Sequence, residues 1–189
     1  MNKKICPWAS TPLYEKYHNE EWGKPLHDDR ELFEMFILEG MQAGLSWITV
    51  LNKREYMRKV FDNFDAVKIA KYTESKKQAL LKDPGIIRNR LKINALVQNA
   101  KAYLEVKKEF GSFDKFIWQF VKGKQIINKF TDIKQAPART ELSDAMSKEL
   151  LKRGFKFAGS TICYAYMQAV GMVNDHMTWC KEYNNLKRK

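Results

Sequence analysis

Two things are scarce in this chain of 189 residues: cysteine, and apolar runs of the length that a membrane-spanning helix needs. The three cysteines, Cys6, Cys163 and Cys180, are odd in number and far apart, which argues against a disulfide framework and for a reducing compartment. No charge-free run reaches the ~20 apolar residues of a transmembrane helix, and the first residues hold no apolar segment followed by a cleavage site. These absences predict a cytoplasmic protein with no membrane partner.

Acidic residues are in the minority. The chain has 34 Lys and Arg against 22 Asp and Glu, so its formal net charge is +12. Most of the excess lies in three segments, 88–108, 148–156 and 181–189. Clustered positive charge suits a protein that follows a phosphate backbone, and it indicates a polyanionic partner. A lysine-rich solvated surface gives the same composition, so charge alone does not decide between the two.

Strand-like alternation of apolar and polar residues is missing, whereas the three-and-four spacing of helices recurs along the chain. We therefore predict an all-α fold in a single globular domain covering residues 1–189. The predicted helices are 28–39, 45–61, 66–72, 74–81, 88–107, 113–121, 142–153 and 161–170, with a short helical turn at 176–183. Asp28 is expected to cap the first helix, and Gly44 and Gly154 are expected to end helices. The weakly patterned segment 123–141 is predicted to be a surface excursion.

Two pairs of potential metal ligands lie near opposite ends of the sequence: Cys6 with His18, and His176 with Cys180. The last two are four residues apart, a spacing that places both side chains on one face of a helix. Thiolate and imidazole are the ligands that zinc prefers, and four protein ligands would make a structural rather than a catalytic site. The alternative is that all four are ordinary core residues.

Glu39 falls on the predicted buried face of an apolar helix. A carboxylate there is costly unless it is paired or lines a cavity. Around it the sequence offers the aromatic residues Trp8, Tyr14, Tyr17, Trp22 and Trp47. Trp and Tyr have polar tips and favour half-wet sites such as a base-binding pocket, although aromatic residues belong more often to a core. Local backbone donors at the helix end are the alternative partner for the carboxylate.

A glycine-containing turn, 153–161 (RGFKFAGST), opens one of the predicted helices. Backbone N–H groups at such a helix start can bind a DNA phosphate. The motif by itself is weak, because any pair of helices joined by a turn needs a glycine somewhere.

Four blocks of the sequence, taken together, resemble the DNA-3-methyladenine glycosylase I family. They are 14–23 (YEKYHNEEWG), 38–47 (LEGMQAGLSW), 85–90 (GIIRNR), and 154–157 (GFKF) leading to 173–176 (VNDH). The blocks stand in the family's order, and the resemblance runs nearly from end to end of the chain.

The resemblance implies a two-lobed helix-hairpin-helix DNA glycosylase fold whose lobes share one cleft. It also implies one structural Zn²⁺ per chain, joining the N- and C-terminal segments through Cys6, His18, His176 and Cys180. The family lacks the aspartate that most helix-hairpin-helix glycosylases place just before a histidine. That position corresponds to Asn174 here, and the adjacent Asp175 leaves the exact equivalence open. Ser160 and Thr161 stand where bifunctional relatives have a lyase lysine, which implies a monofunctional enzyme.

The implied activity is hydrolysis of the N-glycosidic bond of 3-methyladenine in alkylated double-stranded DNA, performed by a monomer. Methylation makes this base cationic, so it leaves as a neutral molecule, and the enzyme's task is to select it after it has rotated out of the duplex. In this reading Glu39 is the catalytic carboxylate. The implied substrate-binding residues are Tyr17, Trp47, Trp22, Trp8 and Tyr14, and the implied DNA contacts are Gln42, Gly44, Leu45, Lys156 and Gly159.

Two other classes of protein fit the same features. A basic, zinc-stapled module that binds damaged DNA without catalysis would release no free base. A zinc hydrolase would need an open coordination position on its metal, which four protein ligands argue against.

Overall fold

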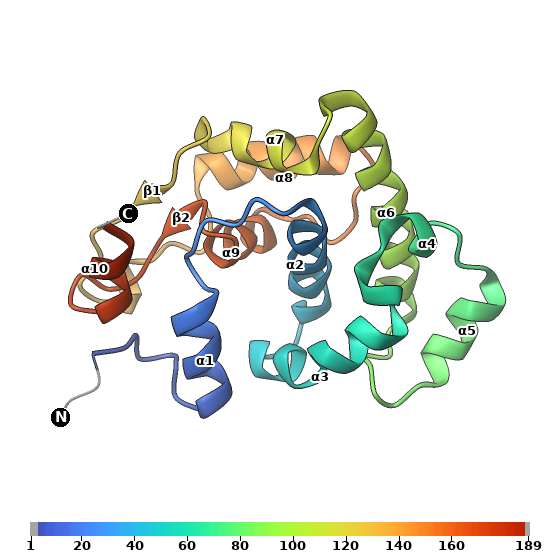
Figure 1. Cartoon of the computed structure of the whole chain (residues 1–189), viewed down its shortest axis with the longest axis horizontal. Helices are drawn as coiled ribbons and strands as arrows, with labels where there is room; N and C mark the ends of the chain where they lie inside the picture. Colours follow the sequence, from blue (N-terminus) through green and yellow to red (C-terminus); the bar gives the residue numbers. More distant parts are fainter. Residues whose placement is uncertain (1–3, 188–189) are drawn as a thin grey trace.

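A long helix buried along most of its length, α2 (Asp29–Gln42), lies at the centre of the molecule (Figure 1). The computed structural model describes residues 4–187 of the chain, apart from the side chain of Lys187. Asp28 caps α2 by accepting hydrogen bonds from the backbone N–H groups of Arg30 and Glu31, as the sequence predicts. Every residue from Leu32 to Met41 is buried, and α3, α6, α7 and α9 pack around them.

The other elements are short helices in succession. The α-helices besides α2 are α1 (Pro12–Glu20), α3 (Trp47–Val60), α4 (Ala66–Ile69), α5 (Glu74–Lys82), α6 (Arg90–Phe110), α7 (Phe113–Trp118), α8 (Glu141–Lys152), α9 (Ser160–Ala169) and α10 (Lys181–Lys187). Single 3₁₀ turns are η1 (Asp62–Phe64), η2 (Gln119–Val121) and η3 (Ile133–Gln135). Thr11, Asp65, Thr73, Asn89, Ser112 and Thr140 cap helices with their side chains. Local sequence therefore sets most helix starts.

The predicted helices are confirmed with ends shifted by a few residues, and Gly44 and Gly154 take the expected left-handed backbone, with φ of +75° and +88°. The structure is mostly helical, as predicted, but the all-α prediction leaves out one short pair of strands. β1 (Ile126–Ile127) and β2 (Val173–Asn174) form a short parallel pair. Two residues are too few to show alternation, and their partners lie far apart in the sequence.

The predicted helical turn at 176–183 is also wrong in its first half. Residues 175–180 are not helical, and α10 begins at Lys181. Pairing of β2 with β1 draws this segment into the protein, where residues 173–177 are all buried. A single helical face could not bury consecutive side chains in this way.

The two ends of the described chain meet. α1 and α10 lie at the same side of the molecule (Figure 1), and the backbone N–H of Lys181 donates to the carbonyl of Lys4 at 2.9 Å. This contact brings Cys6 and His18 near the segment that holds His176 and Cys180. Across residues 4–187, no helix has the length and apolar character needed to cross a membrane.

Candidate active site

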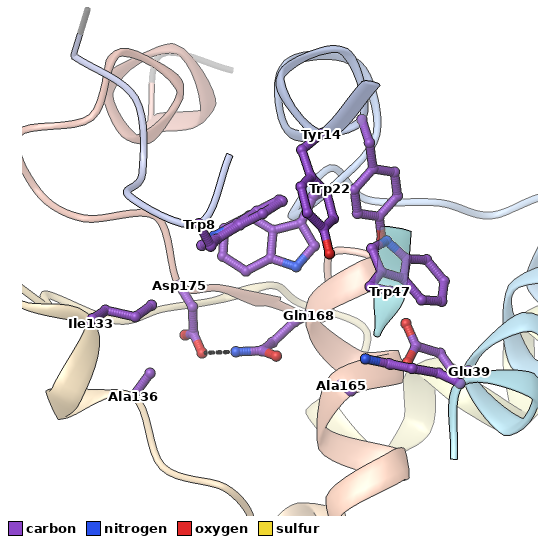
Figure 2. Close-up of a pocket in the computed structure, with 12 residues that line it drawn as sticks. Trp8, Tyr14, Trp22, Glu39, Trp47, Ile133, Ala136, Ala165, Gln168 and Asp175 are labelled. Atoms are coloured by element: carbon purple, nitrogen blue, oxygen red, sulfur yellow. Dashed lines mark hydrogen bonds between the residues drawn. The ribbon is translucent and has the colours of Figure 1, made fainter. Parts of the chain in front are cut away.

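A cavity of about 280 Å³ opens between α1, the end of α2, the start of α3 and α9 (Figure 2). All the residues that the sequence places around Glu39 line it. The lining residues are Trp8, Tyr14, Tyr17, Trp22, Glu39, Gln42, Trp47, Ile133, Ala136, Ala165, Gln168 and Asp175. Its volume suits one nucleobase-sized ligand, and a wall rich in aromatic side chains with a few polar groups is typical of such pockets.

Local structure directs the aromatic side chains into the cavity. Tyr14 and Tyr17 are one helical turn apart on α1 and so share a face. The hydroxyl of Tyr14 accepts a hydrogen bond from the backbone N–H of Ile48 at 2.9 Å, which ties α1 to the first turn of α3. Trp47 is the first residue of α3, and its ring centroid lies 5.5 Å from that of Tyr17. Trp8 and Trp22 add a second pair at 4.9 Å.

Glu39 is buried at 4% exposure, yet it faces the cavity. Within residues 4–187 no side chain or backbone group hydrogen-bonds or pairs with its carboxylate. Burial raises the pKa of Glu39 to about 8. Burial, followed by the nearby Glu39 and Glu21 charges, also raises the pKa of Tyr17, which keeps that hydroxyl protonated. The cavity thus holds an uncompensated carboxylate surrounded by electron-rich rings, an arrangement that favours a planar, electron-poor ligand.

Trp47 adds an unsatisfied donor to this wall. Its indole Nε1–H is buried and has no partner in the described part of the chain. Unpaired buried donors are rare in folded proteins, and one that lines a cavity indicates a ligand that accepts from it.

Four lining residues were missed by the sequence reasoning, and a fifth, Asp175, was left as an open alternative to Asn174. Ile133 and Ala136 come from the segment predicted as a surface excursion, and Ala165, Gln168 and Asp175 come from α9 and the stretch after β2. The structure separates the two candidates before His176. Asn174 turns its amide oxygen to His176, whereas Asp175 lines the cavity. A carboxylate beside histidine was the one available signal, and sequence alone could not tell which neighbour faces the cavity.

Beside the cavity lies a hollow of about 260 Å³, shared by the turn after α2 and by α9. Gln42, Gly44 and Leu45 line it, and Leu45 is 42% exposed. The buried Lys92 holds this turn, since its Nζ donates to the carbonyls of Met41 and Ala43 at 2.7 Å each. The three residues expected to contact DNA therefore border the mouth of the Glu39 cavity.

Lys156 and Gly159 lie in the turn between α8 and α9, and both are exposed. Asn99 of α6 holds the turn: its Oδ1 accepts from the backbone N–H of Lys156 at 2.7 Å, and its Nδ2 donates to the Lys156 carbonyl at 3.1 Å. Gly159 precedes α9 with no side-chain cap, which leaves the first N–H groups of that helix available.

Cys6, His18 and Cys180 form a buried cluster whose ligand atoms all lie within 4.8 Å of one another. The distance from His18 Nε2 to Cys180 Sγ is 3.5 Å, close to the separation expected between two ligands of one tetrahedral zinc ion. His176, the fourth predicted ligand, is not one of these three, but its ring centroid lies 4.7 Å from that of His18 and its Nε2 is buried without a described partner.

The groups around the cluster prepare it for a metal ion. Asn19 and Asn174 accept from Nδ1–H of His18 and His176, at 2.8 and 2.9 Å, so Nε2 is the acceptor nitrogen of each ring. Nε2 of His176 has no described partner, whereas Nε2 of His18 accepts from the backbone N–H of Cys6 at 3.5 Å. Burial, and then the neighbouring His18, lower the pKa of His176 to about 4, so this ring is neutral. The Cys6 thiol donates to Cys180 and lowers the pKa of Cys180. The hydrogen bonds with Cys180 raise the pKa of Cys6 and of His18, so these two groups would give up their protons to a metal ion, since neutral imidazole and thiolate are the forms that bind metals.

Glycine at position 23 is also explained by this cluster. A Cβ atom there would lie 2.7 Å from Cε1 of His176, and the backbone φ is +74°. The residues present therefore fit a zinc ion, with three ligands assembled and His176 beside them.

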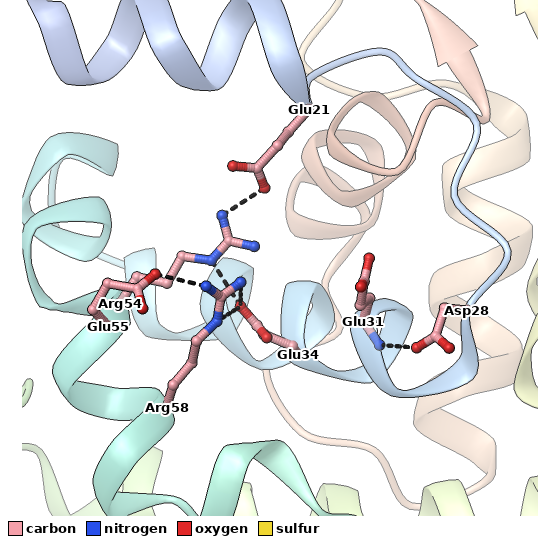
Figure 3. A network of polar contacts seen from close by, with 7 residues as sticks. All are labelled: Glu21, Asp28, Glu31, Glu34, Arg54, Glu55 and Arg58. Atoms are coloured by element: carbon pink, nitrogen blue, oxygen red, sulfur yellow. Dashed lines mark hydrogen bonds and ion pairs between the residues drawn. The ribbon is translucent and has the colours of Figure 1, made fainter.

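An ion-pair network joins the three helices that carry Tyr17, Glu39 and Trp47 (Figure 3). Glu34 of α2 is buried and accepts from Arg54 at 2.7 Å and from Arg58 at 2.8 Å, both on α3. Arg54 also pairs with Glu21, directly after α1, at 2.6 Å. The network thus fixes α1 and α2 against the same face of α3.

Replacing Arg54 by methionine should lower the free energy of unfolding by about 2 kcal/mol, because Glu34 would keep only Arg58 and Glu21 would lose its cation. Urea denaturation measures this. Arg58→Met is the matched control: it leaves the Arg54–Glu34 pair, and its second partner, Glu55, is 81% exposed, so a loss below about 1 kcal/mol is expected. Equal losses would contradict a special role for Arg54.

The clustered basic residues are only partly available to a partner. Lys92 is buried, Lys107 pairs with Asp29, and Arg153 pairs with Glu109 and Glu149. The other basic residues of the three segments whose side chains the structure describes are exposed: Arg88, Arg90, Lys101, Lys108, Lys148, Lys152, Lys156 and Lys181. Arg188 and Lys189 of the third cluster lie outside the described residues. Three members of the clusters therefore hold the fold together, and a phosphate-binding surface would draw on the exposed ones.

Comparison with known proteins identifies the family. A family model described as methyladenine glycosylase matches residues 8–183. The DNA-3-methyladenine glycosylase of Haemophilus influenzae is 51% identical over 176 residues, which cover 93% of this chain and 95% of that protein. DNA-3-methyladenine glycosylase 1 of Escherichia coli is also 51% identical over 176 residues, covering 93% of this chain and 94% of its own length.

Solved structures agree. A crystal structure of 3-methyladenine DNA glycosylase I superposes with a TM-score of 0.92 at 50% identity, covering 94% of this chain and 98% of that one. The Staphylococcus aureus enzyme, whose structure was solved to explain its recognition of 3-methyladenine, gives a TM-score of 0.93 at 32% identity, with coverage of 97% and 98%. The chain therefore belongs to the methyladenine glycosylase family.

Proposed function

We propose that this protein is a DNA glycosylase that hydrolyses the N-glycosidic bond of 3-methyladenine in alkylated double-stranded DNA. The observation that carries the proposal is the Glu39 cavity, in which an unpaired buried carboxylate faces a wall of tryptophan and tyrosine rings. Family membership supports the same activity, since relatives sharing half of the sequence are named for it. We further propose one domain for residues 1–189, acting as a monomer in the cytoplasm.

Selection of the damaged base follows from its charge. Methylation at the 3-position leaves the adenine of the nucleotide cationic, and the faces of aromatic rings attract cations by about 1–2 kcal/mol when water is excluded. Glu39 adds a carboxylate beside the bound base. Because a nearby positive charge favours the ionised carboxyl, binding of the cationic base lowers the raised pKa of Glu39 and drives out its proton. An unmodified, neutral adenine gains neither attraction.

The bond cleavage itself needs little acid catalysis. The C1′–N9 bond breaks with its electron pair going to the base, which leaves as a neutral purine. A water oxygen then bonds to C1′ of the oxocarbenium-like sugar and gives up a proton to the surrounding water. No lysine is among the described residues that line the cavity. A lyase step requires such an amine, which supports a monofunctional enzyme that leaves an abasic site.

Two surface segments are positioned to hold the DNA. The target nucleotide has to rotate out of the duplex to enter the cavity. We assign the vacated space in the duplex to the turn with Gln42, Gly44 and Leu45, because it borders the cavity mouth and exposes an apolar side chain. We assign phosphate binding to the helix-hairpin-helix formed by α8 and α9, through Lys156 and the free N–H groups after Gly159.

We propose that Cys6, His18, His176 and Cys180 hold one structural Zn²⁺. Bound there, the ion would cross-link the N- and C-terminal segments, and four protein ligands would leave no position for a reacting water. The cluster also abuts the cavity, since the His18 ring lies 5.3 Å from that of Trp8. A rigid cluster would therefore support one aromatic wall of the pocket.

A single assay tests the activity. The protein is incubated with methylated duplex DNA without added cofactor, and the released purines are separated by chromatography. Release of 3-methyladenine is expected. A protein that bound the methylated DNA but released no purine would instead be a binding module. Immediate loss of activity on chelation, without unfolding, would indicate a zinc hydrolase.

Binding to DNA should weaken steeply with salt. If several phosphates are neutralised, a plot of log K against log salt falls with a slope of about −0.9 for each contact. Lys156→Met should make that slope shallower by about 0.9, the value of one phosphate contact. Lys77→Met is the control, because Lys77 is on α5 and pairs with Glu74. Fluorescence anisotropy with a duplex containing an abasic-site analogue measures both, and salt-independent binding would rule out the phosphate contacts.

A further inference from the structure

Across the cavity from Glu39 lies an amide whose orientation is fixed (Figure 2). Gln168 of α9 donates a hydrogen bond from Nε2 to Oδ2 of Asp175 at 2.8 Å. Asp175 is 1% exposed, and its other partners are also donors: the Tyr164 hydroxyl at 2.7 Å and Asn128 Nδ2 at 2.6 Å. Both carboxylate oxygens are thereby occupied by protein donors.

This arrangement leaves Gln168 only one way to point its amide. A carboxylate accepts hydrogen bonds, so turning the amide over would place Oε1 against an oxygen of Asp175. Oε1 must therefore face away from Asp175. No donor among residues 4–187 reaches Oε1, while Gln168 itself lines the cavity. The cavity thus contains a fixed hydrogen-bond acceptor on α9 in addition to Glu39 on α2.

The polar groups of the cavity form a definite pattern. Glu39, when ionised, and Gln168 present oxygen acceptors, whereas the Trp47 indole and the Tyr17 hydroxyl present donors. Adenine matches this pattern, because its exocyclic amino group has two N–H donors and its ring nitrogens accept. Guanine has a keto oxygen in place of that amino group, and an oxygen facing a fixed acceptor loses its hydrogen bond to water without gaining another.

We propose that Gln168, oriented by Asp175, is a specificity-determining residue that accepts a hydrogen bond from the exocyclic amino group of the methylated adenine and disfavours 6-keto purines. The inference rests on the proposed function, because it names what the same cavity distinguishes. In it Gln168 contacts the base, and Asp175 is a positioning residue that acts only through Gln168.

The test compares the binding of two free bases, so that neither DNA binding nor bond cleavage affects the measured affinity. Calorimetric titration measures the affinity of the full-length protein for 3-methyladenine and for 3-methylguanine. Gln168→Met keeps the size of the side chain and removes the acceptor. It should weaken 3-methyladenine binding about ten-fold and leave 3-methylguanine binding unchanged or improved, so the preference between the bases narrows about ten-fold or more. If the methionine variant folds poorly, Gln168→Ala replaces it and should also narrow the preference for 3-methyladenine over 3-methylguanine.

Two further variants separate positioning from general damage. Asp175→Asn frees the Gln168 amide to turn over. Introduced into the parent protein, it should narrow the preference for 3-methyladenine over 3-methylguanine. Introduced into Gln168→Met, it should cause no further narrowing. Tyr164→Phe is the matched control: it removes another donor to Asp175 and leaves the Gln168 hydrogen bond, so the preference should stay at the parent value.

An unchanged preference between the bases in both Gln168 variants would overturn the inference. A preference narrowed as much by Tyr164→Phe as by the Gln168 variants would also overturn it, because the effect would then come from packing around Asp175. These results differ from failure of the proposed function. A parent protein that releases no 3-methyladenine from methylated DNA overturns both, whereas a parent that releases it, with variants of unaltered preference, overturns only the role of Gln168.

Discussion

Glu39→Gln is expected to lower the rate of 3-methyladenine release by about 100-fold or more, a loss of roughly 2.7 kcal/mol of transition-state stabilisation. Glutamine has nearly the same shape, so the cavity keeps its volume and its rings. The variant loses the negative charge that offsets the cationic base, and its amide nitrogen presents a further partial positive charge. Single-turnover release from methylated duplex DNA measures the effect. A variant that released the base at the parent rate would remove Glu39 from the mechanism.

The same substitution should make the folded protein more stable at neutral and alkaline pH. The folded protein holds the Glu39 proton up to a pKa of about 8, against an ordinary 4.5 in the unfolded chain. Between these values the folded state binds more protons, so the parent loses stability as pH rises, by at most about 1.4 kcal/mol per pH unit. Because glutamine does not titrate, the free energy of unfolding of the variant does not fall with pH for this reason.

Urea denaturation of both proteins at several pH values tests this expectation. The advantage of Glu39→Gln should be absent below about pH 4, grow between pH 5 and 8, and then level off. A stability difference that did not change with pH would mean that the carboxylate is not buried in the folded protein. The measurement also shows whether lost activity comes from a folded enzyme.

Local signals in the sequence predict most of the helical framework. Asp28 caps α2 because its side chain reaches N–H groups two and three residues ahead, and this depends on no distant residue. Gly44 and Gly154 end their helices because glycine tolerates positive φ. Glu39 stands out because a carboxylate interrupts an otherwise apolar helix face. Each of these features depends only on residues that lie within one or two helical turns of one another in the sequence.

Most of the missed features depend on contacts between distant segments. The exception is α1, which is absent from the predicted helices although Thr11 caps it and Pro12 opens it. β1 and β2 pair Ile126 with Val173, and no local pattern marks two-residue strands. That pairing brings Asn128 to Asp175 and so creates the polar wall with Gln168. Sequence also cannot show which lysines are already engaged; the Nζ of Lys92, for example, binds carbonyls at the end of α2, 49 and 51 residues away.

The cluster of cysteine and histidine was predictable from the sequence in its residue types but not in its geometry. The types of its residues were enough to suggest zinc, because thiolate with imidazole is the donor set of structural zinc sites. The assumed geometry was wrong: His176 and Cys180 do not lie on one helix but on an irregular segment before α10. What brings Cys180 to His18 is the meeting of the two ends of the described chain, where Lys181 bonds to Lys4.

Purified protein should therefore contain one zinc ion per chain, and removal of one ligand should destabilise the fold strongly. Cys180→Ser is expected to lower the free energy of unfolding by about 3 kcal/mol or more, since a structural zinc site contributes its binding energy to folding. For a chain of this length such a loss corresponds to a melting temperature roughly 10 °C lower. Elemental analysis gives the zinc content, and differential scanning calorimetry gives the melting temperature.

Cys163→Ser is the matched control for this variant. Cys163 is also buried, but it lies outside the cluster and donates to the carbonyl of Ala158, a bond that a serine hydroxyl can replace. It should keep the zinc and lose little stability. If zinc is structural, chelation lowers the melting temperature of the parent and of Cys163→Ser, and it leaves Cys180→Ser unchanged. Base release should then decline only as the protein unfolds, because the metal touches no reacting atom. Metal-free protein that melted at the same temperature as the zinc-loaded protein would contradict the structural role.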